Sequence, residues 1–364
     1  MTTYLLAGGG TAGHVNPLLA IADALIAREP EAVVIVLGTR EGLEARLVPQ
    51  RGYELVFVPR VPFPRRLNRQ AWGFPRRFNR AVAGVAELIR LRKVDIVVGF
   101  GGFVSTPAYL AARRTKVPIV IHEANAKPGL ANKVGALFTT HVGVAFAGTP
   151  IRHAQFVGMP LRVEIEKLHR DAVRSEAQDF FGLDHDRKTL LVTGGSLGAR
   201  RLNNTVVQAG TSLIAAGWQV LHITGERGEV TDPKLEHYRM IAYCDRMDLA
   251  LAVADFAVSR AGAATVSELC ALGIPAVYVP YPVGNGEQRF NAAGAVQAGG
   301  ALLVEDSAFL PDWMESELLP VLADTLRLGT MGRAAASVGV RDGSARLLEV
   351  IRTAHQPGGT GPGA

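Results

Sequence analysis

Short runs of mainly apolar residues alternate along the chain with longer segments in which apolar residues recur every three or four positions. A continuous apolar run predicts a strand buried on both faces, and the longer period predicts a helix that packs on it. In the first half, the predicted strands lie at 4–7, 33–37, 54–58, 95–98 and 119–121, and one helix is predicted at about 80–92. This alternation is typical of a doubly wound parallel sheet in an α/β protein.

The second half of the chain begins in the same way as the first. Segment 5–13 (LLAGGGTAG) aligns with segment 190–198 (LLVTGGSLG) without a gap. Further strands are predicted at 189–193, 220–224, 240–243, 255–259 and 276–280. We therefore predict two Rossmann-like domains that face a cleft, one at 1–160 and one at 161–343. A last helix is predicted at about 344–356, and the composition of 357–364, rich in glycine and proline, predicts a disordered tail.

Length and composition fit two globular domains, because 364 residues with 48% hydrophobic content can bury two cores. Met1-Thr2-Thr3 leads directly into a predicted strand, so we expect no N-terminal signal. The uncharged run at 269–286 contains three prolines and three glycines, which argues against a membrane-spanning helix. Cys244 and Cys270 have neither metal nor redox spacing, as is usual in a reducing cytoplasm.

The net charge of +6 comes from one segment of the chain. Ten basic residues and a single acidic residue, Glu87, lie at 60–93, so this segment carries +9 and the remainder carries −3. A charge that is confined to one segment does not indicate affinity of the whole protein for nucleic acid, and we expect no nucleic-acid partner.

A nucleotide-sugar site is predicted where one strand of the second half ends. That strand runs into Ala261-Gly262, and a helix begins at Ala263. The free N–H groups of the first helical turn and its positive dipole end would attract a diphosphate. Glu268 lies one turn further along, where its carboxylate can accept hydrogen bonds from ribose hydroxyls.

The first glycine loop leaves a different enzyme class open. Gly8, Gly10 and Gly13 satisfy the G-x-G-x-x-G pattern of dinucleotide-binding domains. The next strand ends in Gly38-Thr39-Arg40, which offers no acidic group for an NAD ribose but does offer Arg40 for a 2′-phosphate. An NADP-dependent oxidoreductase is therefore an alternative, although it leaves the second half of the chain unexplained.

Five motifs together resemble one known family. They are Gly9-Gly10-Thr11-Ala12-Gly13-His14, Gly99-Phe100-Gly101-Gly102-Phe103, His122-Glu123-Ala124-Asn125, Gly194-Gly195-Ser196-Leu197-Gly198-Ala199-Arg200 and the segment 262–268. Their order and spacing are similar across nearly the whole chain to the MurG family, the N-acetylglucosaminyltransferases that make lipid II for bacterial peptidoglycan. The resemblance implies a glycosyltransferase-B fold, UDP-N-acetylglucosamine on the C-terminal domain and the acceptor, lipid I, on the N-terminal domain. It also implies that the last helix crosses back to the N-terminal domain.

The resemblance further implies which residues contact the donor. They would be Thr11, Ala12, Gly13, Asn125, Arg162, Ser196, Cys244, Ala263, Ala264, Thr265, Val266, Ser267, Glu268, Gln288 and Asn291. Ala12 replaces a more familiar glycine, and Cys244 replaces a larger apolar residue that would meet uracil through its backbone. Phe103 stands where many members carry tyrosine, so a hydroxyl at this position is not essential here.

Inverting transfer to the 4-hydroxyl of the N-acetylmuramyl group needs a base, stabilisation of the leaving UDP and tight positioning of both substrates. His14 is the predicted base because it ends a glycine loop and because histidine is the usual side chain for proton transfer at neutral pH, and Glu123 is the alternative. We expect no cofactor and no protein-bound metal. Asp184-His185-Asp186 imitates the D-x-D metal motif of other glycosyltransferases, but it lies in a polar turn before a strand.

Two further functions remain open at this point. The chain could be another UDP-sugar-dependent glycosyltransferase of the same fold. It could also be a non-catalytic sensor of nucleotide sugars, which would keep Glu268 and Gln288 but would not need His14.

The basic segment at 60–93 predicts a membrane surface. Its arginines are interleaved with large apolar side chains, namely Phe63, Leu67, Trp72, Phe74 and Phe78. Arginines attract anionic headgroups and aromatic rings settle at the interface, so this mixture predicts peripheral docking on the cytoplasmic face of the inner membrane. The alternative is a solvated loop whose aromatic side chains return to the core.

Overall fold

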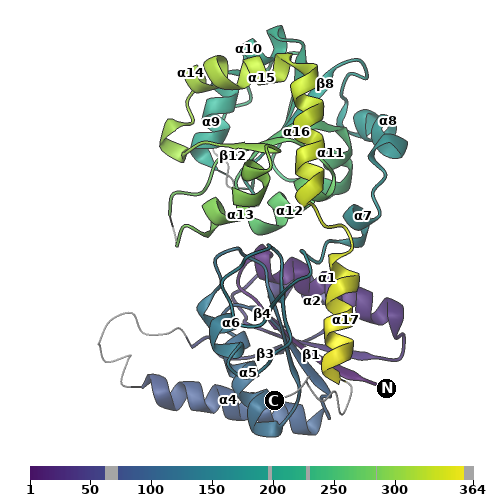
Figure 1. Ribbon diagram of the computed structural model, residues 1–364, viewed down its shortest axis with the longest axis vertical. Coiled ribbons are helices and arrows are strands. Elements are labelled where there is room, and N and C mark those ends of the chain that lie inside the picture. Colours follow the sequence, from purple (N-terminus) through teal and green to yellow (C-terminus); the bar gives the residue numbers. More distant parts are fainter. Residues whose placement is uncertain (62–72, 196–198, 227–229, 284, 356–364) are drawn as a thin grey trace. The chain divides into compact units, whose positions relative to one another are not determined.

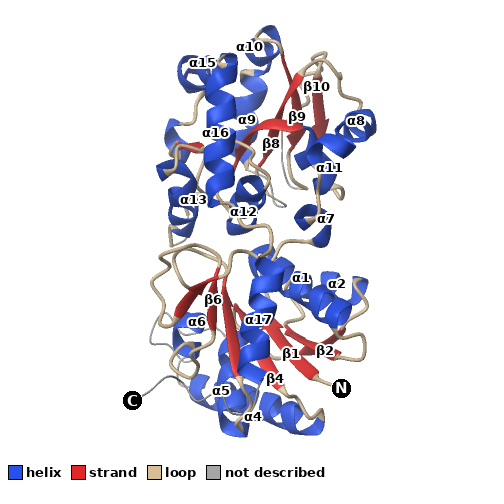
Figure 2. Cartoon of the chain, turned by 45° about the vertical axis from the view of Figure 1, so that its right-hand side comes forward, coloured by secondary structure: helices blue, strands red, loops and turns tan. Residues whose placement is uncertain are grey.

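The computed structural model describes residues 1–61, 73–195, 199–226, 230–283 and 285–355, so the predicted tail at 357–364 lies outside the described residues (Figure 1). The chain forms two compact units. The first unit comprises Met1–Arg162 and the C-terminal segment from Asp342, and the second comprises Val163–Arg341. Each unit contains one parallel sheet with helices packed on it (Figure 2).

The sheet of the first unit has seven strands in the order β3-β2-β1-β4-β5-β6-β7. In chain order they are β1 (Thr3–Gly8), β2 (Val33–Gly38), β3 (Glu54–Phe57), β4 (Ile96–Gly101), β5 (Ile119–Glu123), β6 (Val142–Val144) and β7 (Ala154–Phe156). The helices are α1 (Ala12–Arg28), α2 (Glu44–Gln50), α4 (Phe74–Leu91), α5 (Ser105–Thr115), α6 (Leu130–Gly135) and α17 (Gly343–His355). β1 is central, because Leu5 aligns with Ile35 of β2 on one side and with Val97 of β4 on the other.

Successive residues of β1 enter two different cores. Leu5 and Ala7 pack in a cluster with buried residues of α4 and α5, whereas Tyr4 and Leu6 pack in a cluster with buried residues of α1 and α17. Side chains alternate between the two faces of a strand, so a strand that is covered on both faces must be apolar at every position. This explains the continuous apolar run that predicted β1.

The last helix, α17, belongs to the first unit although the whole of the second unit precedes it in the chain. Leu347 and Ile351 are buried in the cluster that α17 shares with α1. Gly343, its first residue, lies so close to the chain at Met159 that a Cβ atom there would be 2.3 Å from the Met159 carbonyl oxygen. Glycine is therefore required for this contact.

The sheet of the second unit has six strands in the order β10-β9-β8-β11-β12-β13. In chain order they are β8 (Lys188–Thr193), β9 (Trp218–Ile223), β10 (Tyr238–Ile241), β11 (Ala254–Ser259), β12 (Ala276–Tyr278) and β13 (Ala301–Leu303). The α-helices are α7 (Val163–Glu166), α8 (Arg170–Phe181), α9 (Arg200–Gln208), α10 (Gly210–Ala215), α11 (Met247–Val253), α12 (Ala263–Ala271), α13 (Glu287–Gln297), α14 (Pro311–Trp313), α15 (Leu319–Ala323) and α16 (Thr325–Val338). A 3₁₀ turn, η1 (Asp306–Ala308), and a π-helical turn, η2 (Met314–Leu318), complete the unit.

His222, a buried residue of β9, has hydrogen-bond partners for both ring nitrogens within the second unit. Burial lowers the pKa of His222 to about 4, so the ring is neutral at pH 7. Its Nε2 lies 3.1 Å from Asn203 Oδ1 and its Nδ1 lies 2.8 Å from the Tyr238 hydroxyl. A neutral ring can donate to the amide oxygen and accept from the hydroxyl, so both nitrogens have partners.

Some elements differ from those that the pattern predicted. α4 begins at Phe74, well before the predicted start near residue 80, because the basic residues of its first turns conceal the apolar period. β5 continues through His122 and Glu123, which the sequence had placed after the strand. The three-residue strands β6 and β13 were not predicted, since so few residues carry little periodic signal.

Candidate active site

Two glycine loops of the first unit meet at the carboxyl ends of β1 and β4. These strands are neighbours, but the chain leaves β1 towards β2 on one side and joins β4 to β5 on the other. Ligands of open α/β sheets bind at such a switch point. A Cβ atom at Gly102 would lie 2.6 Å from the Gly9 carbonyl oxygen, so the two loops are in contact through their backbones.

His14 lies in the first turn of α1, directly after the first glycine loop, and is half-buried. Its Nδ1 is 3.2 Å from the Gly9 carbonyl oxygen and 3.4 Å from Thr11 Oγ1. A carbonyl oxygen can only accept a hydrogen bond, so a hydrogen bond between these atoms requires the proton on Nδ1 and leaves the lone pair of the neutral ring on Nε2. A Cβ atom on Gly101 would lie 3.1 Å from Nε2, and the glycine at this position therefore leaves room beside that nitrogen.

A carboxylate that the sequence did not single out lies beneath the first loop. Glu44, the first residue of α2, is fully buried. Its Oε2 accepts a hydrogen bond from the Gly10 N–H at 2.8 Å, and its Oε1 accepts from the Thr39 N–H at 2.8 Å and from the Thr39 hydroxyl at 2.9 Å. The Gly10 N–H already donates to the Glu44 carboxylate, and the negative charge of this carboxylate would repel a phosphate placed there. The contact therefore argues against dinucleotide binding at G-x-G-x-x-G.

Glu123, the alternative base, is the last residue of β5 and is only 2% exposed. Its Oε1 accepts from the Asn125 N–H at 2.9 Å, and its Oε2 accepts from the Gly129 N–H and from Asn132 Nδ2, both at 2.9 Å. Both oxygens are therefore engaged in shaping the loop that carries Asn125. This geometry fits a positioning role for Glu123 better than proton abstraction.

His122, beside Glu123, is buried and neutral. Burial lowers its pKa to about 4, and its Nε2 lies 3.0 Å from the Gly158 carbonyl oxygen. The N–H at Nε2 therefore donates to the segment that leads out of the first unit.

Phe103, at the end of the second glycine loop, is 46% exposed, and the guanidinium carbon of Arg60 lies 4.6 Å from the centroid of its ring.

The predicted diphosphate-binding position of the nucleotide-sugar site is the N-terminus of α12. The helix begins at Ala263, and its N-cap residue, Gly262, has no side chain to form a capping hydrogen bond. The first helical N–H groups are directed to the carboxyl ends of the strands. Thr265, Ser267 and Glu268 follow on this helix and are half-buried.

A second helix is attached to the same loop. Asn291 of α13 is buried and its Nδ2 donates to the Ala261 carbonyl at 3.2 Å. Gln288, in the first turn of α13, accepts a hydrogen bond from the Tyr281 N–H at 2.9 Å. Asn291 therefore contacts the loop before α12, and Gln288 contacts the loop after β12.

Arg260 is a residue of this site that sequence reasoning missed. It follows β11, is 9% exposed and forms an ion pair with Asp306 at 2.7 Å. Its Nη1 donates to the Val279 carbonyl at 3.1 Å and to the Pro280 carbonyl at 3.2 Å. The side chain thus ties the loop after β11 to the loop after β12. A basic residue directly before an Ala-Gly turn was the available signal.

The remaining predicted donor contacts have varied surroundings. Val266 and Ala263 are buried, Ala264 is half-buried, and Cys244 is buried after β10. Arg162 is half-buried at the end of the first unit. Ser196 lies outside the described residues, as does the side chain of Ala12. Thr11 is exposed and Gly13 is half-buried at the start of α1.

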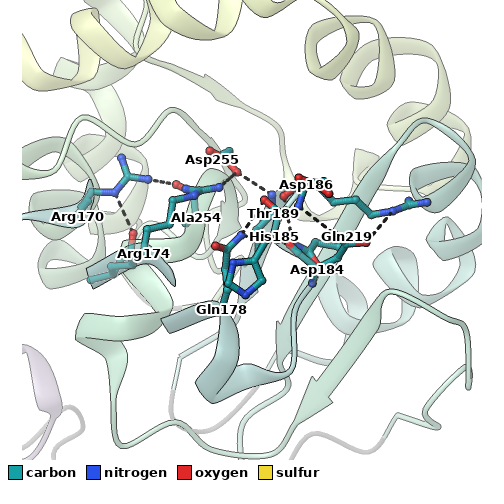
Figure 3. Close-up of polar contacts among 12 residues, drawn as sticks. Arg170, Arg174, Gln178, Asp184, His185, Asp186, Thr189, Gln219, Ala254 and Asp255 are labelled. Carbon is teal, nitrogen blue, oxygen red and sulfur yellow. Dashed lines mark hydrogen bonds and ion pairs between the residues drawn. The ribbon is translucent and has the colours of Figure 1, made fainter. Parts of the chain in front are cut away.

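The D-x-D sequence forms a turn that is held by hydrogen bonds within the second unit (Figure 3). It precedes β8, so it lies at the amino end of the strands, away from the loops that follow them. The Asp186 N–H donates to Asp184 Oδ1 at 2.8 Å, and Gln219 and Gln178 donate to the Asp184 carbonyl. Among the described residues, no cluster of three or more His, Cys, Asp or Glu side chains could hold a metal ion.

Two family models match the chain. The glycosyltransferase family 28 N-terminal domain matches residues 4–144, and the glycosyltransferase family 28 C-terminal domain matches residues 189–347. The chain belongs to glycosyltransferase family 28. The first match covers β1 to β6 and the second covers β8 to β13, so both halves of the predicted repeat are accounted for.

Curated relatives and solved structures confirm the resemblance to the MurG family and the glycosyltransferase-B fold. A UDP-N-acetylglucosamine–N-acetylmuramyl-(pentapeptide) pyrophosphoryl-undecaprenol N-acetylglucosamine transferase from Leifsonia xyli subsp. xyli is 64% identical over 97% of this chain and 99% of its own length. The crystal structure of Acinetobacter baumannii MurG matches with a TM-score of 0.79 at 26% identity and covers 97% of this chain and 100% of that one. A UDP-N-acetylglucosamine 2-epimerase from Neisseria meningitidis, bound to UDP-N-acetylglucosamine, shares the fold alone, with a TM-score of 0.69, 13% identity and coverage of 97% and 100%.

Within the part of the chain that the structure describes, no helix is both long and apolar enough to cross a bilayer.

Proposed function

We propose that the chain transfers N-acetylglucosamine from UDP-N-acetylglucosamine to the 4-hydroxyl of the N-acetylmuramyl group of lipid I, with inversion, and so makes lipid II for peptidoglycan. The observation that carries the proposal is the 64% identity, over nearly the full length of both chains, to a transferase that is named for this donor and this acceptor. The chain is a UDP-N-acetylglucosamine-dependent glycosyltransferase in which the nucleotide sugar is a substrate. No resident cofactor is needed for this chemistry.

In the proposed reaction, Nε2 of His14 is the base. It takes the proton of the acceptor hydroxyl while the hydroxyl oxygen bonds to C1 of N-acetylglucosamine. The bond from C1 to the diphosphate oxygen breaks, and its electron pair leaves with UDP. The contact between Nδ1 and the Gly9 carbonyl supports this role, because it keeps the proton on the other ring nitrogen.

The departing UDP carries negative charge, and the N-terminus of α12 would stabilise it. Backbone N–H groups and the helix dipole favour a diphosphate at Ala263, Ala264 and Thr265. Glu268 would accept hydrogen bonds from the ribose hydroxyls. Gln288 and Asn291 of α13 would complete the donor site.

The family resemblance adds further donor contacts to the proposal. In the first unit these are Thr11 to Gly13, Asn125 and Arg162. In the second unit they are Ser196, the backbone at Cys244, and Val266 with Ser267. Glu123 would act indirectly, because its carboxylate holds the N–H of Asn125.

The decisive experiment is transfer of labelled N-acetylglucosamine from its UDP ester to a lipid I analogue by the purified chain. His14→Ala is expected to lower kcat by about 10² to 10⁴, the range for loss of a general base. UDP affinity should change little. His169→Ala, which removes an exposed histidine at the start of α8, is the matched control and should keep wild-type turnover.

Other outcomes would favour the alternatives. Epimerised UDP-sugar without transfer would indicate the chemistry of the fold neighbour. Saturable binding of NADPH would support an oxidoreductase. If the chain binds the UDP-sugar without turnover, and His14→Ala does not change this affinity, the chain is a non-catalytic sensor of nucleotide sugars.

We also propose that the first unit docks on the anionic cytoplasmic face of the membrane, where the polyprenyl chain of lipid I stays. α4 supports this within the described residues, because Arg76, Arg77 and Arg80 are exposed while its apolar side is buried. Phe74 stacks on Phe78 with ring centroids 5.4 Å apart at the start of the helix. Phe63, Leu67 and Trp72, with the arginines between them, lie outside the described residues.

A further inference from the structure

We infer that Glu44 is a positioning residue for His14 and acts through the peptide group between Gly9 and Gly10. The inference rests on the proposed role of His14 as the base. It adds a buried carboxylate from α2 to a reaction centre that the sequence motifs place on the loops after β1 and β4.

One peptide group joins the two side chains. Its N–H, which belongs to Gly10, donates to Glu44 Oε2 at 2.8 Å. Its carbonyl, which belongs to Gly9, accepts from His14 Nδ1 at 3.2 Å. Hydrogen bonds in a chain polarise one another, by roughly 10–30% per bond, so the carboxylate makes the Gly9 oxygen a better acceptor. A base that is oriented by a third group is the usual arrangement in activated catalytic centres.

The backbone around Glu44 is built to admit the carboxylate. Cβ atoms at Gly9, Gly38 and Gly42 would lie 2.4, 2.4 and 2.1 Å from atoms of the Glu44 side chain. Gly10 has φ +92°, in the region that favours glycine, and this conformation turns the shared peptide group towards both partners. Three glycines, Gly9, Gly38 and Gly42, thus make room for one buried charge.

The carboxylate shapes the loops and also places a charge behind the shared peptide group. Its two oxygens accept hydrogen bonds from Gly10 and Thr39, and burying a carboxylate is costly unless its charge is used or fully paired. In the proposed reaction His14 becomes positively charged when Nε2 takes the acceptor proton. A negative charge behind the shared peptide group would stabilise that state and would hold the proton of the neutral ring on Nδ1.

Glu44→Gln removes the charge with little change of volume, and its amide nitrogen also replaces one of the two accepting oxygens. We expect kcat to fall by at least about 10-fold, a part of the ~10² to 10⁴ that a positioned base supplies, while KM for UDP-N-acetylglucosamine changes less than about threefold. Thr39→Val is the matched control, because it removes one donor from the same carboxylate but keeps the charge and the Gly10 contact. Its kcat should stay within about threefold of the parent value.

A double variant separates this inference from the proposed function. If Glu44 acts through His14, Glu44→Gln should cause no further loss of kcat in a His14→Ala background. An equal loss in both backgrounds would overturn the inference, as would a kcat within twofold of the parent, or a raised donor KM with unchanged kcat. Full activity of His14→Ala would instead overturn the role of His14 itself.

A measurement on the unmodified chain applies even if Glu44→Gln fails to fold. The nine histidines can be labelled with ¹⁵N, and the His14 ring signals are assigned by their absence in His14→Ala. We expect a protonated Nδ1 and an unprotonated Nε2 in the neutral ring. A neutral ring with its proton on Nε2 would overturn the inference, because the Gly9 carbonyl would then have no donor.

Discussion

At the level of single residues, Glu268 tests the donor site most directly. If its carboxylate holds the ribose hydroxyls, Glu268→Ala should weaken UDP binding by about 1.5–3 kcal/mol, the scale of a hydrogen bond to a charged group. Calorimetric titration with UDP measures the change. Glu176→Ala removes an exposed carboxylate from α8 of the same unit and should leave UDP affinity unaltered. Equal affinities for the parent and Glu268→Ala would remove this residue from the donor site.

Gly102 tests the contact between the two glycine loops. Gly102→Ala combines a positive φ of +85° with a Cβ atom 2.6 Å from the Gly9 oxygen, so it must displace the loop that holds His14. Gly52→Ala is a matched control, because it has φ +77° with open space around its Cβ position. Both changes should lower the free energy of unfolding by about 1–2 kcal/mol through backbone strain, and Gly102→Ala should lower it further. Only Gly102→Ala should also reduce transfer. Similar losses of stability and activity in both variants would mean that the loop contact is unimportant.

The sequence predicted site residues that belong to recognisable motifs, such as His14 after a glycine loop. It did not predict Glu44 or Arg260, because their importance comes from tertiary contacts. A glutamate at the start of a short helix is normally an exposed dipole partner. Only the fold brings Glu44 beneath Gly10 and places three glycines around it.

At the level of elements, α4 is the testable membrane surface. Arg76, Arg77 and Arg80 changed together to serine should reduce binding to anionic liposomes, since each arginine near the headgroups contributes about 1 kcal/mol. The salt dependence of sedimentation should weaken as well. Serine at Arg289, Arg327 and Arg333 removes the same charge from the second unit and serves as the control. If both triple variants sediment like the parent at every salt concentration, α4 does not dock on the membrane.

Element prediction succeeded where burial on both faces makes a strand apolar throughout, as in β1 and β8. It failed for elements whose signal is short or mixed. β6 and β13 have three residues each, and the first turns of α4 contain proline and arginine. These elements form because neighbouring strands and helices supply the missing stabilisation.

At the level of the whole molecule, burial keeps His122 of the first unit and His222 of the second unit neutral. Burial lowers the pKa of His122 and of His222 to about 4, below the ordinary value of 6.5. The unfolded chain therefore binds protons at pH 5 that the folded chain does not, so stability falls as pH drops from about 6.5 towards 4. Each histidine should cost about 2 kcal/mol between pH 7 and pH 5. Urea unfolding at the two pH values measures this. An unchanged free energy of unfolding would mean that neither ring is neutral and buried in solution.

The fold class and the family could be predicted from the sequence because both depend on signals that extend along the chain. Strand and helix alternate throughout, and the glycine motif recurs at 190–198. The predicted domains, 1–160 and 161–343, end close to the limits of the two units at Arg162 and Arg341.

The return of α17 to the first unit has a consequence for protein synthesis. The ribosome makes the whole of Val163–Arg341 before it makes Gly343–His355. The second unit is therefore complete while the first still lacks the helix that covers Leu18 and Val98. Nascent domains usually finish in order from the N-terminus, but here the first unit must finish last. Until α17 emerges, the nascent chain exposes an apolar face for which a chaperone is the natural temporary partner.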